Sequence, residues 1–267
     1  YRRKKQLNES IHSFERALHL CEAQGNFRTV AHIYGNIATV YCDSNRPVEA
    51  LPFSQKAVDY ALQYGTPQMI GLFYVNLGAI QCNVPGKIRD GIATLQKAIP
   101  VLKEVNNKRR LCEAYNHLAN AYRGLGQIDS AMVCLQSLDE MSGELRTDVE
   151  RYRYHQTRGP LMQELKRYRE AVISYQRLID MQKAGYRDMK DYDVYLHLSE
   201  CLHELQNEAK AYESLRTAYA LRDSASKKEY TEQLSDFLAK YRTKEKELEI
   251  TRLKQAALER KAELLRN

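Results

Sequence analysis

The stretch Tyr34-Gly-Asn-Ile-Ala-Thr-Val-Tyr41, followed by Arg46-Pro-Val-Glu-Ala-Leu51, predicts two short helices joined by a turn. The pattern returns further along the chain as Tyr74-Val-Asn-Leu-Gly with Asp90-Gly-Ile-Ala, and as Tyr115-Asn-His-Leu-Ala-Asn-Ala-Tyr122 with Asp129-Ser-Ala-Met. Fainter copies carry Glu170-Ala-Val-Ile and Lys210-Ala-Tyr-Glu. Self-similarity at a fixed period indicates a repeat architecture. The sequence therefore predicts an array of helix pairs.

A small residue near the start of the second helix of each pair sets the period. The positions are Ser10, Ala50, Gly91, Ala131, Ala171 and Ala211, so the successive gaps are 40, 41, 40, 40 and 40 residues. Two packed helices approach closely at such a position, and a larger side chain there would be overpacked. The spacing predicts one helix at residues 7–24, the second half of a repeat, and then helix pairs at 28–64, 68–105, 108–142, 147–184 and 188–222.

Three prolines bear on the predicted helices. Pro47 stands at the start of a second helix, where proline is tolerated. Pro52 lies one turn further on, so it should bend the helix or shift its start. Gly159-Pro160 stands where a close-packing pair is expected, and it predicts a kink.

The composition is that of a packed helical protein. Of the 267 residues, 43% are hydrophobic, and only 12 are glycine and 6 are proline, which favours helix over turn-rich β structure. The net charge is +7, but basic and acidic residues are interspersed along the helices and form no single patch. The charge therefore indicates a solvated surface, with an acidic partner as the alternative interpretation. No helix-turn-helix, zinc-finger or RNA-recognition signature is present, so we expect this chain to bind no nucleic acid.

No pattern in the chain carries catalytic or metal-binding chemistry. The six cysteines form no CxxC pair, and most stand beside apolar residues, where a free thiol behaves as a small hydrophobe. The seven histidines lie singly, and we expect them to be surface or packing residues. No phosphate-binding loop, HExxH, GxSxG or kinase signature occurs. We therefore expect no enzymatic activity, no cofactor and no metal in this chain.

The repeat resembles the tetratricopeptide repeat (TPR) family, whose first helix carries an aromatic residue, Leu, a small residue and Tyr at fixed positions. The matching residues are Tyr34, Ile37, Ala38, Tyr41, Ala50, Ser54 and Ala57 in one pair, and Tyr115, Leu118, Ala119, Tyr122, Ala131, Leu135 and Leu138 in another. The usual period is about 34 residues, so this form is longer, and Gln81 stands where Tyr is usual. The resemblance implies an all-α fold. Residues 1–222 would form a TPR-like α-solenoid, a right-handed superhelix of antiparallel helix pairs with one half repeat and five pairs.

In this family the first helices of the pairs line a concave groove that binds protein or peptide. The resemblance implies that the groove is lined here by Asn36, Thr39, Asn76, Asn116, Asn120, Arg123 and Arg153, with Val75 and Gln156 in the same register. Asparagine both donates and accepts hydrogen bonds, so it suits a peptide bond. The two arginines are candidates for an anionic ligand, although the basic carboxylate clamp known in the family is not reproduced.

Residues 223–267 predict one long helix. Ser226-Lys-Lys-Glu229 reads as a capping box, and no glycine or proline follows it. A narrow apolar stripe indicates a coiled coil, and hence a homodimer, or packing on a neighbour. Its residues are Leu234, Leu238, Tyr241, Leu248, Leu253 and Leu264. The alternative is a capping helix that folds back onto the last repeat.

The tail also resembles the junction in membrane-bound TPR regulators of the Bacteroidetes type, where a helix leads into a transmembrane segment and then a histidine kinase or a DNA-binding output domain. The resemblance implies the extracytoplasmic (periplasmic) sensing region of a two-component regulator, relaying its signal through residues 223–267. The membrane would be reached outside this chain, which has no run of about 20 apolar residues, and Tyr1-Arg-Arg-Lys-Lys does not begin a signal peptide. The alternative is a cytoplasmic TPR adaptor or peptide-responsive regulator that scaffolds protein–protein interactions.

Overall fold

The computed structural model describes residues 2–145, 147–185 and 191–222, which are helical apart from short turns and contain no strand. The bounds are α1 (Arg2–Ala23), α2 (Phe27–Asp43), α3 (Pro47–Tyr64), α4 (Pro67–Cys82), α5 (Ile88–Glu104), α6 (Lys108–Gly124), α7 (Ile128–Met141), the short 3-10 helix η1 (Ser142–Glu144), α8 (Asp148–Glu164), α9 (Tyr168–Lys183) and α10 (Asp191–Glu204), with residues 208–222 also helical. After the single helix α1, the helices follow one another as pairs, so the predicted all-α array is confirmed. The predicted relay stripe from Leu234 to Leu264 lies outside the described residues.

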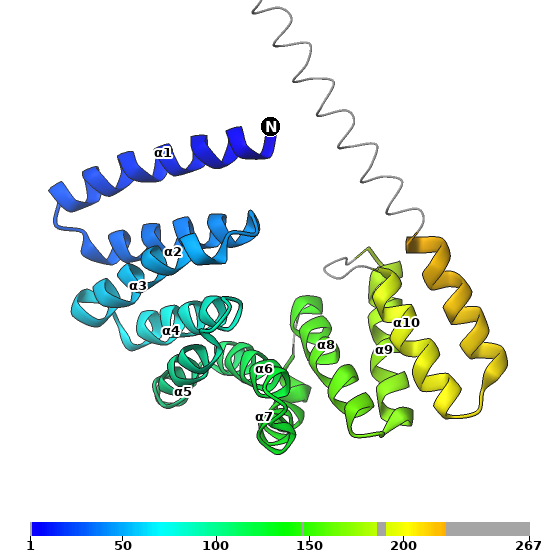
Figure 1. Cartoon of the computed structure of the whole chain (residues 1–267). Helices are drawn as coiled ribbons and strands as arrows, with labels where there is room; N and C mark the ends of the chain where they lie inside the picture. The colour runs from blue at the N-terminus through cyan, green and yellow to red at the C-terminus, as the bar shows by residue number, and fades with distance from the viewer. Residues whose placement is uncertain (1, 146, 186–190, 223–267) are drawn as a thin grey trace, which may run out of the picture.

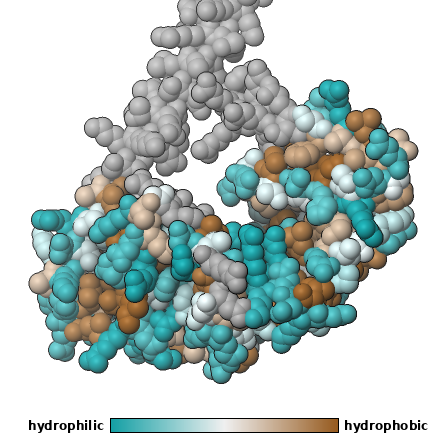
Figure 2. Space-filling model, turned by 180° about the vertical axis from the view of Figure 1, so that it is seen from behind, coloured by the Kyte–Doolittle hydropathy of each residue, from teal (hydrophilic) through white to brown (hydrophobic). Residues whose placement is uncertain are grey.

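The helix pairs form an arc, with α1 near one end and α10 near the other (Figure 1). Figure 2 shows the hollow of this arc from behind, with hydrophilic side chains gathered along its floor. The apolar core continues through the array, and it is unbroken at the junction of α7 and α8, where Leu138 and Tyr152 are fully buried in one cluster. Cys112, Cys134 and Cys201 are buried among such residues, as free thiols.

The small residue that sets the period is buried where the two helices of a pair meet. Ala50, Ala131 and Ala171 each have an exposed fraction of 0%. Gly91 is the tightest case, because an added Cβ would lie 2.5 Å from Cys82 Sγ and 2.7 Å from the carbonyl oxygen of Gly78. Helices α4 and α5 thus approach more closely than a methyl group allows, which explains why the third pair has glycine here.

The turns inside the pairs repeat with the same period as the sequence. Each contains one residue with positive φ, and these residues are Asn45, Gly86, Gly126, Lys166 and Gln206, at gaps of 41, 40, 40 and 40. Positive φ favours glycine and, next, asparagine, so Lys166 and Gln206 occupy a backbone conformation that their side chains disfavour. The extra residue of the third pair lies in the longer turn 83–87 between α4 and α5.

The prolines disturb the helices less than the sequence predicts. Helix α3 begins at Pro47 as expected, and Pro52 lies inside it without shifting that start. Helix α8 runs from Asp148 to Glu164 through Pro160, so the predicted kink there involves no break. A Cβ at Gly159 would lie 2.9 Å from the Tyr175 ring, which shows that this glycine lets α8 and α9 pack closely.

Candidate binding groove

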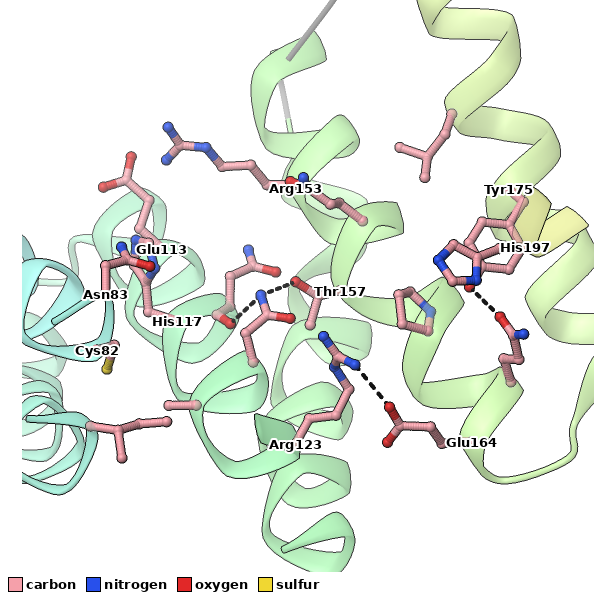
Figure 3. A pocket seen from close by; sticks show the side chains of 18 residues that line it. Cys82, Asn83, Glu113, His117, Arg123, Arg153, Thr157, Glu164, Tyr175 and His197 are labelled. Atoms are coloured by element: carbon pink, nitrogen blue, oxygen red, sulfur yellow. Dashed lines mark hydrogen bonds and ion pairs between the residues drawn. The ribbon is translucent and has the colours of Figure 1, made fainter. Parts of the chain in front are cut away.

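A cavity of about 780 Å3 lies between α6 and α8 (Figure 3). Helices α6 and α8 supply most of its wall, the α4–α5 turn borders one side, and α9 and α10 border the other. A volume of this size is typical of ligand sites. The cavity is therefore the candidate functional site.

The predicted groove residues fall into two sets. Four of them, Asn116, Asn120, Arg123 and Arg153, line the cavity together with Gln156. The other three, Asn36, Thr39 and Asn76, do not, and their ligand role stays a prediction. Thr39 Oγ1 donates to the carbonyl of Gly35 at 3.0 Å. The placement of Val75 was wrong: it is only 2% exposed and belongs to the core, because it points between the helices.

Asn116 is a buried polar side chain in the wall of the cavity. It is 5% exposed, and its Oδ1 has no hydrogen-bond partner. Burying an acceptor without a donor costs roughly 1–3 kcal/mol. The main-chain carbonyl of Asn116 is satisfied, because Asn120 Nδ2 donates to it at 3.1 Å and also to Thr157 Oγ1 at 3.0 Å, which joins α6 to α8. A ligand that donates an N–H or O–H would satisfy the open acceptor.

Two further polar atoms of the cavity wall are buried without a hydrogen bond. They are Arg123 Nε and His197 Nδ1. Arg123 forms an ion pair from Nη1 to Glu164 Oε1 at 2.8 Å. The His197 ring stacks on Tyr175 with centroids 5.6 Å apart, and its Nδ1 lies 3.5 Å from Glu200 Oε2. The cavity thus offers an open acceptor and open donor positions at once.

Electrostatics make His117 a neutral group of the cavity. Burial lowers its pKa to about 4; nearby Arg153 lowers it too, and Glu113 opposes the shift. Near neutral pH the imidazole therefore has one nitrogen to donate and one to accept. Glu113 is itself held by ion pairs with Arg109 and Arg110.

The expectation that the histidines serve only surface or packing roles missed His117 and His197. Both line the cavity, and they stand 40 residues on either side of Thr157, which lines it as well. The repeat period was therefore the signal that could have found them. Asn76, which was placed on the groove, corresponds to His117 across the 41-residue gap, so the period places His117, Thr157 and His197 at the same position of successive pairs.

Within residues 2–145, 147–185 and 191–222, no group of three or more His, Cys, Asp or Glu side chains could hold a metal ion. None of the helices that the structure describes is both long and apolar enough to cross a membrane.

Comparison with known proteins supports a TPR-like architecture. Residues 113–144, which cover α6 and α7, match the family described as tetratricopeptide repeat. The structure of BtubC (BKLC) from P. vanneervenii is similar with a TM-score of 0.66 and 15% identity, over 85% of this chain and 93% of that one. The TPR-like repeats of a putative kinesin light chain from Podosopora anserina give a TM-score of 0.56 and 15% identity, over 74% and 97% of the two chains.

A further structural neighbour is aspartyl phosphate phosphatase F from Bacillus subtilis, with a TM-score of 0.60 and 20% identity. The match covers 82% of this chain and 56% of the phosphatase. No curated protein matches the sequence significantly. The described residues therefore form a TPR-like α-solenoid, a fold that suggests protein–protein interaction.

Proposed function

We propose that this chain is a protein-binding scaffold whose cavity between α6 and α8 holds an extended segment of a partner polypeptide. The observation that carries the proposal is Asn116, which is 5% exposed, lines the cavity and has an unpaired Oδ1. A peptide N–H supplies the donor that Asn116 lacks, and a peptide carbonyl supplies an acceptor for the unpaired Arg123 Nε.

The polarity of the wall favours a polypeptide over an apolar small molecule. Asn116, Gln156 and Thr157 line it together with charged side chains. An apolar ligand would bury these groups without hydrogen bonds, at a cost of about 1–3 kcal/mol for each. An extended peptide offers one donor and one acceptor per residue along its length, so it can satisfy groups spread over several helices.

A displayed random-peptide library tests this proposal. Peptides selected on the full chain should lose at least about tenfold in affinity on Asn116→Leu, the effect of a buried hydrogen-bond group of about 1.4 kcal/mol. Asn36→Leu, the same substitution on another first helix, is the control, because Asn36 lies outside the cavity and is exposed. Selected peptides that bind Asn116→Leu and the native chain equally would overturn the proposal.

We further propose, from the resemblance of the sequence, that the array is the periplasmic sensing region of a bacterial two-component regulator that relays through residues 223–267. The gene sequence after Asn267 tests this placement. An apolar run of about 20 residues followed by a histidine kinase or DNA-binding domain would support it. A stop codon or a soluble domain would instead support the cytoplasmic adaptor or peptide-responsive regulator.

The homodimer is a separate proposal. Light scattering on the chain with and without residues 223–267 should show a dimer only when these residues are present. A monomer in both samples would refute dimerisation through the C-terminal segment.

A further inference from the structure

The last described helix, residues 208–222, carries an uncovered apolar face. Tyr212 and Tyr219 are 69% and 46% exposed, and Leu215 between them is half-buried. Spacings of three and four residues place these three side chains on one side of the helix. Arg222 lies over the Tyr219 ring, with its Cζ 4.5 Å from the ring centroid. Large exposed side chains gathered on one face mark an interaction site.

In the preceding pairs the same face is buried. Tyr175 and Ile179 of α9 stand 40 residues before Leu215 and Tyr219, and each is only 2% exposed. The next first helix, α10, packs on them, and its His197 ring stacks on Tyr175 with centroids 5.6 Å apart. In the earlier pairs, the position of Leu215 is buried as well, in the residues Ser54, Leu95 and Leu135. The face is therefore one that a following first helix covers elsewhere in the array.

We infer that this face is covered by residues 228–244 of the same chain, which form the first helix of a further half-pair, a first helix without a second. These residues lie beyond the described part of the chain, and the repeat period places them. Helix α8 begins at residue 148, and two periods of 40 residues lead to position 228. The inference does not depend on the ligand proposed for the cavity.

The sequence has a helix start where the period requires one. Thr147 and Glu150 form the capping box at the start of α8. Ser226 and Glu229 repeat this pair of residue types 79 residues later, within one residue of two full periods. A new helix is thus expected to begin beside residues 208–222.

The apolar residues of this segment fall on the positions that a first helix buries. Leu234, Leu238 and Tyr241 stand 40 residues after three core residues of α10, namely Val194, Leu198 and Cys201, which are 0%, 5% and 0% exposed. An apolar side chain is therefore present at each position that would face the uncovered Tyr212, Leu215 and Tyr219.

Two departures from the repeat indicate that the half-pair lacks a second helix. Ser235 and Arg242 stand at the positions that Tyr34 and Tyr41 occupy in α2. Tyr34 and Tyr41 each stack on a ring of α3, the second helix of their own pair. A first helix without a second helix has no such ring to contact, so polar residues suit these two positions. Atypical terminal repeats are usual in such arrays.

The apolar stripe of the C-terminal segment would then divide in two. Leu234, Leu238 and Tyr241 pack within the array, and Leu248, Leu253 and Leu264 alone remain for a homodimer. Helix α10 borders the cavity. A helix on the next face of the array would therefore join the proposed relay segment to the helices around the ligand site.

A pair of introduced cysteines in the full chain tests the inference. Leu215→Cys with Phe237→Cys places thiols 40 residues after Tyr175 and His197, whose rings stack at 5.6 Å. A disulfide requires Cα atoms within about 7 Å, so mild oxidation should link positions 215 and 237, as mass spectrometry of the digested chain detects. Leu215→Cys with Leu253→Cys is the control pair, and it should form no such link. Oxidation of mixed nitrogen-15 and unlabelled chains distinguishes a link within one chain from a link between two copies.

Hydroxyl-radical footprinting measures the cover without any link. The oxidation rate of Tyr219 in the full chain should rise at least about threefold in Leu238→Asp, because a buried charge expels the covering helix. Leu253→Asp, the same substitution outside the half-pair, should leave the rate unchanged. Far-ultraviolet circular dichroism checks that the array stays folded in both variants.

Three results would overturn the inference. They are a link no more frequent than in the control pair, a link between two copies, and equal oxidation of Tyr219 in the native chain and in Leu238→Asp. None of them bears on Asn116, so the peptide library tests the proposed function separately.

Discussion

Replacing Asn116 with leucine should stabilise the fold while it removes a ligand contact. The side chain is 5% exposed and its Oδ1 is unpaired, and such an acceptor costs roughly 1–3 kcal/mol. Leucine has no acceptor to leave unpaired. The hydrogen bond from Asn120 goes to the main-chain carbonyl, so it survives the substitution. Because the Asn116 amide nitrogen is lost as well, we expect the lower part of that range, about 1–2 kcal/mol of added stability.

Urea denaturation followed by far-ultraviolet circular dichroism measures this difference. Asn36→Leu is the control, since the same substitution at an exposed position should change the free energy of unfolding by less than about 0.5 kcal/mol. A less stable Asn116→Leu variant, or equal changes in the two variants, would refute the argument that Asn116 is held ready for a ligand at the expense of the fold.

Three further predictions concern packing, turns and pH. Gly91→Ala should destabilise the fold by about 1–2 kcal/mol, because its Cβ would lie 2.7 Å from a carbonyl oxygen. Gly124→Ala is the control: its Cβ would meet one side-chain atom at 3.6 Å, and it should stabilise the fold by about 0.5 kcal/mol. If urea denaturation shows that both variants change the free energy of unfolding in the same direction, the close approach of α4 and α5 is contradicted. Lys166→Gly and Gln206→Gly should each raise stability by about 0.5–1 kcal/mol, since glycine relieves the strain of a positive φ but costs chain entropy. Thermal denaturation measures the gain. A loss of stability in both variants would count against backbone strain at Lys166 and Gln206. The pKa of His117 is about 4 in the folded chain and about 6.5 in the unfolded chain. The unfolded state therefore binds the extra proton, and stability falls by up to about 3 kcal/mol as the pH drops from 6.5 to 4. Between pH 7 and 5 the free energy of unfolding should decline less steeply in His117→Gln than in the native chain, and parallel declines would disprove the shift.

The fold could be predicted because its constraint is local and periodic. The two helices of a pair have to contact each other at a small residue, so the spacing of Ala50, Ala131 and Ala171 predicts the pairs directly from the sequence. All three residues are fully buried. The prolines were harder to interpret. Whether Pro52 shifts a helix start depends on the packing around it, and α3 begins at Pro47 regardless.

The site could be predicted only in part, for a physical reason. Asn116 and Arg123 were placed on the groove by their register, but their distinctive property is an unpaired buried atom. That property depends on which polar groups are missing nearby, and the sequence does not record it. Glu164 was missed because it is 41 residues from its partner Arg123, on a different helix.

The turn between α4 and α5 absorbs the one residue by which the third pair exceeds the period, so the first helices stay in register across the insertion. Positions 36, 76, 117, 157 and 197 are therefore equivalent positions on successive first helices. A protein engineer could change the specificity of the concave face by moving a side chain 40 residues along the chain, or 41 across the α4–α5 turn, without redesigning the backbone. The same property would let natural variation relocate a binding site from one helix pair to the next by single substitutions.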